Sequence, residues 1–254
     1  MKPKKSLGQN FLTNISVAAD MVRHLEIKET DKILEIGGGQ GAVTAFIVNY
    51  PYRTLDVYEL DKSLVPFLKK EFKSNNINVI NENFLDADLS QYDGDFKVVG
   101  SIPYYITSPI IHKLLALPVG HRPKKIVLMI QKEVGEKILK KAPSSSYWSY
   151  ITLGYKAEMV RFVSEKDFYP EPMVKSIVIK LTKDEAGSKL IEKIGFRNWE
   201  KFLHHVYKNP RKMINKVFEK DFLAEMKIDS NLRPQNIELE KWIEVYEGTH
   251  TSHV

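Results

Sequence analysis

The sequence predicts an α/β fold, a mostly parallel sheet with helices on both faces, followed by a small all-helical domain. Three observations predict it. A strand, a glycine-rich turn, a helix and a second strand follow one another between Asp31 and Asp61. Short apolar runs and helical patterns then alternate, as in doubly wound parallel sheets. Beyond Leu181, a polar linker is followed by apolar residues at helical spacing. We therefore expect domains over residues 1–182 and 183–254.

The stretch from Asp31 to Asp61 has the order of a nucleotide-binding unit. Its first strand ends at closely spaced glycines, which allow positive φ and a close approach of the backbone to a ligand. Its second strand delivers Glu59, and folds of this kind place a carboxylate there to bind ribose hydroxyls. A nucleoside ligand is therefore indicated. Because Gly37, Gly39 and Ala42 also fit the nicotinamide pattern G-x-G-x-x-A, a nicotinamide-dependent oxidoreductase stays open.

The remaining elements of the first domain follow in order. A basic N-terminal arm leads into a helix that Asn14 can cap. The predicted helices cover residues 15–25, 42–48 and 63–73, and the predicted strands cover residues 32–36, 54–60, 78–80 and 97–99. Ligands of such sheets bind outside the carboxyl ends of the strands. Since Glu59, Asn83 and Ser101 each lie at such an end, we expect them to share one site with the glycine turn.

The residues after the fourth strand form a rigid shelf. Pro103 fixes its own φ and holds Ile102 extended, so Ser101 and Tyr104 are presented in a defined geometry. A planar base can stack on Tyr104, while Ser101 and a main-chain carbonyl accept hydrogen bonds from an exocyclic amine. This shelf indicates recognition of a nucleobase.

Composition narrows the class of protein. With 254 residues, 43% of them hydrophobic and 28% charged, the chain can fold as a large domain with a small one. It has no cysteine, which excludes disulfides, thiolate metal sites and a cysteine nucleophile, and fits a reducing cytoplasm. No apolar run approaches the roughly 18 residues of a membrane span, and no signal peptide is visible, so we expect a cytoplasmic protein.

Positive charge favours a polyanionic partner. The net charge is +6, and Lys and Arg gather in residues 122–141 and 197–216. Clustered Lys and Arg favour contact with a phosphate backbone. Either cluster alone could equally be the solvated face of an amphipathic helix.

Several motifs together resemble the S-adenosylmethionine-dependent ribosomal RNA adenine dimethyltransferases. They lie at residues 8–12, 35–41, 59–61, 101–104, 107–109, 131–134, 168–172 and 174–176. The resemblance extends in order from about residue 5 to residue 246. Residues 131–134 and 232–237 make the chain more similar to the KsgA type, which dimethylates two adjacent adenines near the 3′ end of small-subunit rRNA. The erythromycin-resistance methyltransferases of large-subunit rRNA are the alternative within this family.

The resemblance implies a Rossmann-like S-adenosylmethionine-dependent methyltransferase domain, with small-subunit rRNA as partner. The expected mechanism needs no metal, and we assume a monomer. The implied catalytic residues are Ser101, Tyr104 and Phe168, of which the two aromatic residues sandwich the target adenine. The cofactor-binding residues are expected to be Asn10, Leu12, Gly37, Gly39, Gly41, Glu59, Asn83 and Ser101. RNA contacts are expected from Arg122, Lys124, Lys125, Lys208, Arg211 and Lys212.

Two positions depart from the pattern of this family. Asn83 stands where the family usually has Asp to accept from the adenine amine of the cofactor, and Ser101 stands where it usually has Asn. The Asn83 carbonyl can still accept, although hydrogen bonds to an ionised partner are about twice as strong. We expect an enzyme with a modified active site. A non-catalytic ribosome-assembly factor on the same scaffold remains an alternative.

Overall fold

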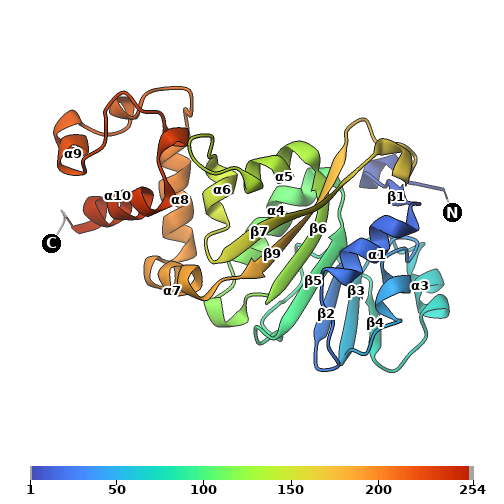
Figure 1. Cartoon of the computed structure of the whole chain (residues 1–254). Coiled ribbons are helices and arrows are strands. Elements are labelled where there is room, and N and C mark those ends of the chain that lie inside the picture. Colours follow the sequence, from blue (N-terminus) through green and yellow to red (C-terminus); the bar gives the residue numbers. More distant parts are fainter. Residues whose placement is uncertain (1, 252–254) are drawn as a thin grey trace. The chain divides into compact units, whose positions relative to one another are not determined.

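The computed structural model describes residues 2–251 (Figure 1), which divide into two compact units. The first unit comprises Met1–Gly135 and Tyr155–Asp184, and the second comprises Glu136–Gly154 and Glu185–Val254. The expected boundary after residue 182 lies close to this division. It did not anticipate that residues 136–154 belong with the second unit, where the Trp199 indole donates to the carbonyl of Tyr150 at 2.9 Å.

Within residues 2–251, seven strands of the first unit form one sheet, in the order β4-β3-β2-β5-β6-β9-β7. These strands are β2 (Lys32–Ile36), β3 (Thr54–Tyr58), β4 (Ile77–Ile80), β5 (Phe96–Ser101), β6 (Lys125–Gln131), β7 (Tyr155–Val163) and β9 (Ser176–Lys183). The pairs from β4 to β6 are parallel, whereas β9 pairs antiparallel with both β6 and β7. The predicted α/β fold with a mostly parallel sheet is confirmed.

Helices cover both faces of this sheet, and in Figure 1 α1 lies in front of it and α4 behind it. The helices that begin in the first unit are α1 (Ile15–Arg23), α2 (Thr44–Ile47), α3 (Val65–Glu71), α4 (Thr107–Leu115) and α5 (Lys132–Leu139). The Asn14 side chain accepts from the Ser16 amide at 3.0 Å, which confirms the predicted cap of α1. The helix expected over residues 42–48 is only the single turn of α2.

The N-terminal arm is tied to a distant part of the first unit. β1 (Phe11–Leu12) pairs antiparallel with β8 (Phe168–Tyr169), so that Leu12 lies opposite Phe168. Leu12 and Phe168 both pack into the hydrophobic core with α1 and the central strands. The pairing therefore fixes both segments at the same place.

The second unit is helical. Its elements are α6 (Tyr147–Ile151), α7 (Glu185–Ile194), α8 (Phe196–Val206), α9 (Lys220–Glu225) and α10 (Leu239–Thr251). Trp199 and Leu203 of α8 are fully buried together with Trp242 of α10, as the helical spacing predicted for α8. Helical spacing of apolar residues in this part of the sequence also predicts an apolar face that includes Met213, but Met213 is 46% exposed.

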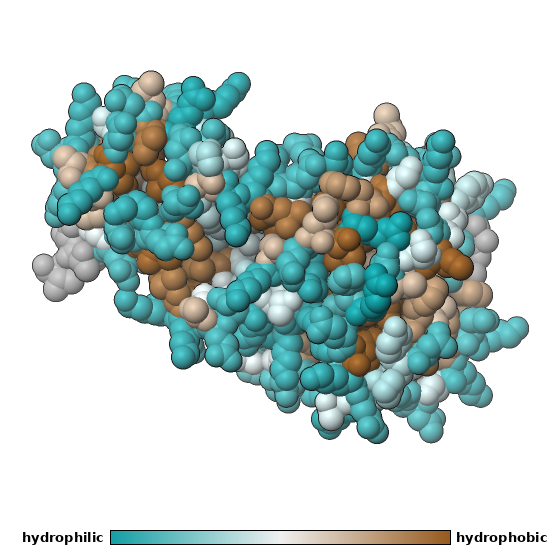
Figure 2. Space-filling view, viewed as in Figure 1, coloured by the Kyte–Doolittle hydropathy of each residue, from teal (hydrophilic) through white to brown (hydrophobic). Residues whose placement is uncertain are grey.

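Apolar side chains are concentrated inside the units, and Figure 2 shows a mostly hydrophilic surface with small apolar patches. None of the helices within residues 2–251 has the length and apolar character needed to cross a membrane.

Gly135 of α5 packs closely against the sheet. A Cβ atom added there would lie 2.3 Å from Cγ2 of the buried Ile177 on β9. Overpacking of this kind costs about 1–3 kcal/mol, of which better helix propensity returns up to about 1 kcal/mol. We expect Gly135→Ala to lower the free energy of unfolding by about 1–2 kcal/mol in urea denaturation. Gly120→Ala is the matched control, because its Cβ would meet no atom within 4 Å. A Gly135→Ala protein as stable as the wild type would contradict this packing.

Candidate active site

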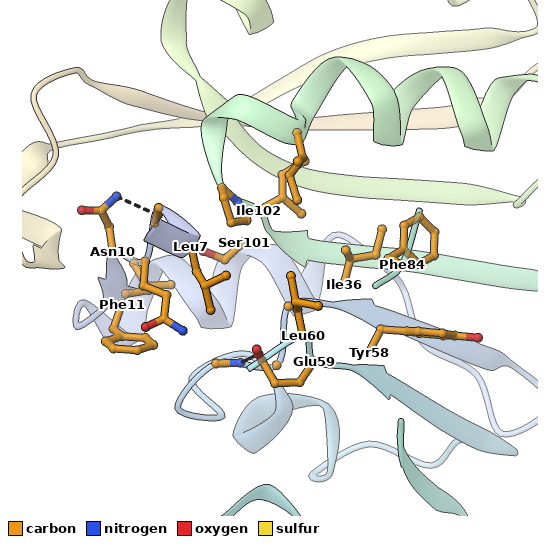
Figure 3. Close-up of a pocket in the computed structure, with 18 of the residues that line it drawn as sticks. Leu7, Asn10, Phe11, Ile36, Tyr58, Glu59, Leu60, Phe84, Ser101 and Ile102 are labelled. Atoms are coloured by element: carbon orange, nitrogen blue, oxygen red, sulfur yellow. Dashed lines mark hydrogen bonds between the residues drawn. The ribbon is translucent and has the colours of Figure 1, made fainter. Parts of the chain in front are cut away.

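A cavity opens at the carboxyl ends of β2, β3 and β5 in the first unit (Figure 3). Five segments and Phe168 supply most of its wall. These segments are the N-terminal arm at residues 7–12, the glycine turn at residues 36–40, the end of β3 at residues 58–60, the loop at residues 82–84 and the loop at residues 101–106. The cavity thus lies where ligands of doubly wound sheets bind.

The glycine turn is held against the end of β3. The amides of Gly37 and Gly38 donate to the Tyr58 carbonyl at 2.8 and 3.3 Å. Gly37 and Gly39 have φ of 77° and 54°, which side chains with a Cβ rarely adopt. Gly41 does not line the cavity, because its Cβ position points at the Phe72 ring, 2.4 Å away. Gly41 was predicted as a cofactor-binding residue, but in the structure it packs against Phe72 behind the turn.

Glu59 joins the glycine turn to the chain after β3. One carboxylate oxygen accepts from the Gly39 amide and the other from the Asp61 amide, both at 2.7 Å. The residue is only 6% exposed, and this burial raises the pKa of its carboxyl group. A carboxylate offers about four lone-pair sites, so two acceptor positions remain for a ligand. Glu59 lines the cavity and can accept from a pair of hydroxyls (Figure 3).

Glu35 is a second buried carboxyl group in the cavity wall, and the sequence analysis did not select it. It accepts a hydrogen bond from Thr44 Oγ1 at 2.7 Å and is 1% exposed. Burial raises its pKa to about 8, although the Thr44 hydrogen bonds oppose the shift. The sequence feature that indicates a site role for Glu35 is its position at the end of a buried strand, two residues before the first glycine.

The N-terminal arm covers one side of the cavity. Lys4 Nζ lies 2.5 Å from Asp61 Oδ1, and the Gln9 amide donates to the other oxygen of Asp61 at 2.9 Å. Burial alone would raise the pKa of Asp61, but hydrogen bonds from Lys4, Ser63 and Gln9 outweigh it and hold the pKa well below its usual range. The Asn10 side chain is held by a hydrogen bond to the Gly8 carbonyl at 3.3 Å (Figure 3). The arm is thus anchored by Asp61 at one end and by β8 at the other.

The three predicted catalytic residues lie in the wall of the same cavity. Ser101 ends β5, Tyr104 begins the short helical turn that follows, and Phe168 arrives on β8. The Tyr104 hydroxyl is 2.6 Å from Ser176 Oγ, which orients its ring. Asn10, Leu12, Gly37, Gly39, Glu59 and Asn83 also line the cavity. The structure therefore brings together all predicted catalytic and cofactor-binding residues except Gly41.

The loop after β4 is held tightly. Asn83 Oδ1 accepts from the Leu85 amide at 3.2 Å, and its Nδ2 donates to Asp86 at 2.9 Å. Lys113 of α4 donates to the carbonyls of Leu85 and Ala87 at 2.8 and 2.6 Å. The buried Phe84 ring meets the Tyr58 ring edge-on at 5.5 Å. This loop presents a fixed edge to the cavity.

The predicted RNA-binding residues need a correction. Arg122 is 1% exposed and its Nε donates to the Leu117 carbonyl at 3.0 Å, so the side chain is part of the interior. Lys125 is 7% exposed and forms an ion pair with Glu26 at 2.8 Å. Neither side chain can reach a phosphate backbone in this structure. Lys124 is exposed, as are Lys208, Arg211 and Lys212 of the second unit.

Comparisons with known proteins agree with the motif-based resemblance. The family model described as ribosomal RNA adenine dimethylase matches residues 1–250. The ribosomal RNA small subunit methyltransferase A of Hydrogenobaculum sp. is 34% identical over 84% of this chain and 82% of its own length. The protein of the same name from Mycoplasma mycoides subsp. mycoides is 32% identical over the full length of both chains.

Solved structures show the same fold. A dimethyladenosine transferase from Plasmodium falciparum superposes with a TM-score of 0.82 at 21% identity, over 96% of this chain and 98% of that one. The 23S rRNA methyltransferase ErmE superposes with a TM-score of 0.73 at 22% identity, over 94% and 98% of the two chains.

Burial of Glu35 makes stability depend on pH. Between the ordinary pKa of 4.5 and the folded value of about 8, the folded chain holds a proton that the unfolded chain has lost. Stability therefore falls as pH rises through this range, by at most about 1.4 kcal/mol per pH unit. We expect the free energy of unfolding of Glu35→Gln, measured from pH 5 to 8, to fall less steeply than that of the wild type. Glu29→Gln controls for loss of an exposed carboxyl group, and parallel curves for wild type and Glu35→Gln would refute the assignment.

The Lys4–Asp61 contact predicts a measurable change in the arm. Removal of the Lys4 side chain removes one of the two side-chain contacts of the arm to Asp61, so Lys4→Ala should speed amide hydrogen exchange in residues 5–10 several-fold. Lys5→Ala, an exposed neighbour, should leave these rates unchanged. Equal exchange rates in the two variants would show that Lys4 does not anchor the arm.

Proposed function

The chain belongs to the ribosomal RNA adenine dimethylase family, and on this premise we propose that it transfers methyl groups from S-adenosylmethionine to the N6 amine of adenines in rRNA. We propose as substrate two adjacent adenines near the 3′ end of small-subunit rRNA, each dimethylated. The relatives at more than 30% identity carry the name small subunit methyltransferase, which favours this substrate over large-subunit rRNA. The enzyme is proposed to act as a cytoplasmic monomer.

One observation carries the proposal, namely that a ribose-binding carboxylate and a nucleobase shelf line the same cavity. Glu59 and the glycine turn form one wall, and Ser101, Tyr104 and Phe168 form another. A cofactor and a base could therefore meet within it. A nicotinamide-dependent oxidoreductase would leave the shelf without a role.

The wall near Glu59 fits S-adenosylmethionine. Glu59 keeps acceptor positions for two ribose hydroxyls. A Cβ atom added at Gly37 would lie 3.6 Å from the carbonyl oxygen of Ser101. The space that this Cβ would fill is thereby left open for a ligand. Asn83 and Phe84 offer an acceptor and an apolar ring to an adenine. When bound, S-adenosylmethionine would supply an electrophilic methyl group.

The protein residues would act by positioning the target amine. The lone pair of an adenine amine is delocalised into the ring, so the amine is a poor nucleophile. Acceptors at Ser101 Oγ and at the carbonyl of Ile102 or Pro103 would draw its hydrogens out of the ring plane and localise the lone pair. Tyr104 and Phe168 would hold the unstacked base between them. Stacking on an aromatic side chain would contribute about 1–3 kcal/mol per base to binding. Near-attack positioning of two reactants can contribute about 7–11 kcal/mol.

The second unit would supply contacts to the RNA backbone. Lys208, Arg211 and Lys212 are exposed around one turn, as a phosphate-binding site requires. These residues would fix the position of the rRNA rather than read its sequence.

The direct test is methyl transfer to small ribosomal subunits that lack the modification. With radiolabelled S-adenosylmethionine, we expect label to appear in rRNA and nucleoside mass spectrometry to find dimethyladenosine. Phe168→Ala should lower kcat/KM by about ten- to a hundredfold through lost stacking. Tyr50→Ala, which removes a surface aromatic residue outside the cavity, should keep full activity. Wild-type protein that binds the subunits but transfers no methyl group would instead be a non-catalytic assembly factor.

A further inference from the structure

The side-chain amide of Asn83 is fixed in one of its two orientations. Its oxygen accepts from the Leu85 amide at 3.2 Å, and its nitrogen donates to the Asp86 carboxylate at 2.9 Å. A flipped amide would lose both hydrogen bonds. It would also bring its nitrogen to the Leu85 N–H and its oxygen to the carboxylate, so donor would face donor and acceptor would face acceptor.

The backbone holds Asp86 in place for this contact. Its amide donates to the Asn83 carbonyl at 2.8 Å, which closes the turn between the two residues. Lys113 of α4 binds the next carbonyls of the same loop, those of Leu85 and Ala87. The distance between the Asp86 carboxylate and the Asn83 amide is therefore set by the loop.

The orientation of Asn83 matters because this residue lines the cavity. Leu60, Phe84 and Ile102 line the same cavity (Figure 3), and such apolar side chains can pack against a flat ring. A purine with a 6-amino group needs an acceptor at its edge, whereas a purine with a 6-oxo group needs a donor. An amide can offer either, according to its orientation, but an aspartate at this position would offer only acceptors at neutral pH.

We propose that Asp86 is a positioning residue, which holds Asn83 with its oxygen available to the 6-amino group and so makes the cofactor site selective for adenine. This inference rests on the proposed function, since it takes the adenosyl group of the cofactor as the ligand of this wall. Asp86, whose carboxylate confers the selectivity, thus lies three residues after Asn83, the residue that contacts the base.

The test compares binding of S-adenosylhomocysteine and S-inosylhomocysteine, which differ at this purine position, by titration calorimetry. The wild type should prefer the adenosyl ligand. Asp86→Ala removes one of the two hydrogen bonds that hold the amide in this orientation, so this preference should fall by about three- to tenfold, mainly through weaker binding of the adenosyl ligand. Asp88→Ala is the matched control, because the Asp88 carboxylate binds Ser90 and leaves Asn83 untouched. Its preference should equal that of the wild type.

A second background shows whether Asp86 acts through the amide. In Asn83→Asp protein no amide remains to turn, so adding Asp86→Ala should not lower the preference for the adenosyl ligand. A further loss in this background would overturn the proposal, as would an unchanged preference in Asp86→Ala alone. Equal weakening of both ligands would also overturn it, because Asp86 would then only support the loop. Failure of the wild type to bind either ligand would instead remove the proposed function, and this inference with it.

Discussion

The geometry of the site depends on the Glu59 carboxylate and its hydrogen bonds to two backbone amides. Gly39 belongs to the glycine turn and Asp61 to the chain after β3, so the carboxylate joins two segments that no strand pairing connects. The Asp61 carboxylate in turn accepts hydrogen bonds from the side chains of Lys4 and Gln9 in the N-terminal arm. Two acidic residues, Glu59 and Asp61, thus hold together the glycine turn, the chain after β3 and the N-terminal arm. Their environments differ, because burial raises the pKa of Glu59 whereas hydrogen bonds hold that of Asp61 low.

Much of this arrangement could be predicted from local sequence patterns. Buried parallel strands appear as short apolar runs, and the residues that follow them meet at one edge of the sheet. This pattern predicts that Glu59, Asn83 and Ser101 share one site, and all three line the cavity. The family resemblance added Phe168, whose position has no local explanation because it depends on pairing of two-residue strands. Residues 136–154 are a similar case, because their composition does not indicate that they pack with the second unit.

Clusters of Lys and Arg in the sequence were the least reliable predictor of functional residues. A cluster of Lys and Arg in the sequence records how many cations are present but not where their side chains point. Lys125 pairs with Glu26 and Arg122 lies in the interior, so part of the apparent basic face is structural. Asp86 is the opposite case, since nothing in the sequence distinguishes this exposed acidic loop residue from others. Two hydrogen bonds connect it to the cavity wall, one from Asn83 Nδ2 to its carboxylate and one from its own amide to the Asn83 carbonyl.

The pairing of β1 with β8 also has a consequence for the order in which the protein is made. Phe11 and Leu12 leave the ribosome early, whereas their partners Phe168 and Tyr169 follow only after most of the first unit has been synthesised. A contact between such distant segments forms late in folding, because a long loop must be closed first. A nascent chain that ends before β8 already contains the glycine turn and Glu59 but lacks Phe168 and the partner of β1. The wall of the cavity is therefore complete only after β8 has been made.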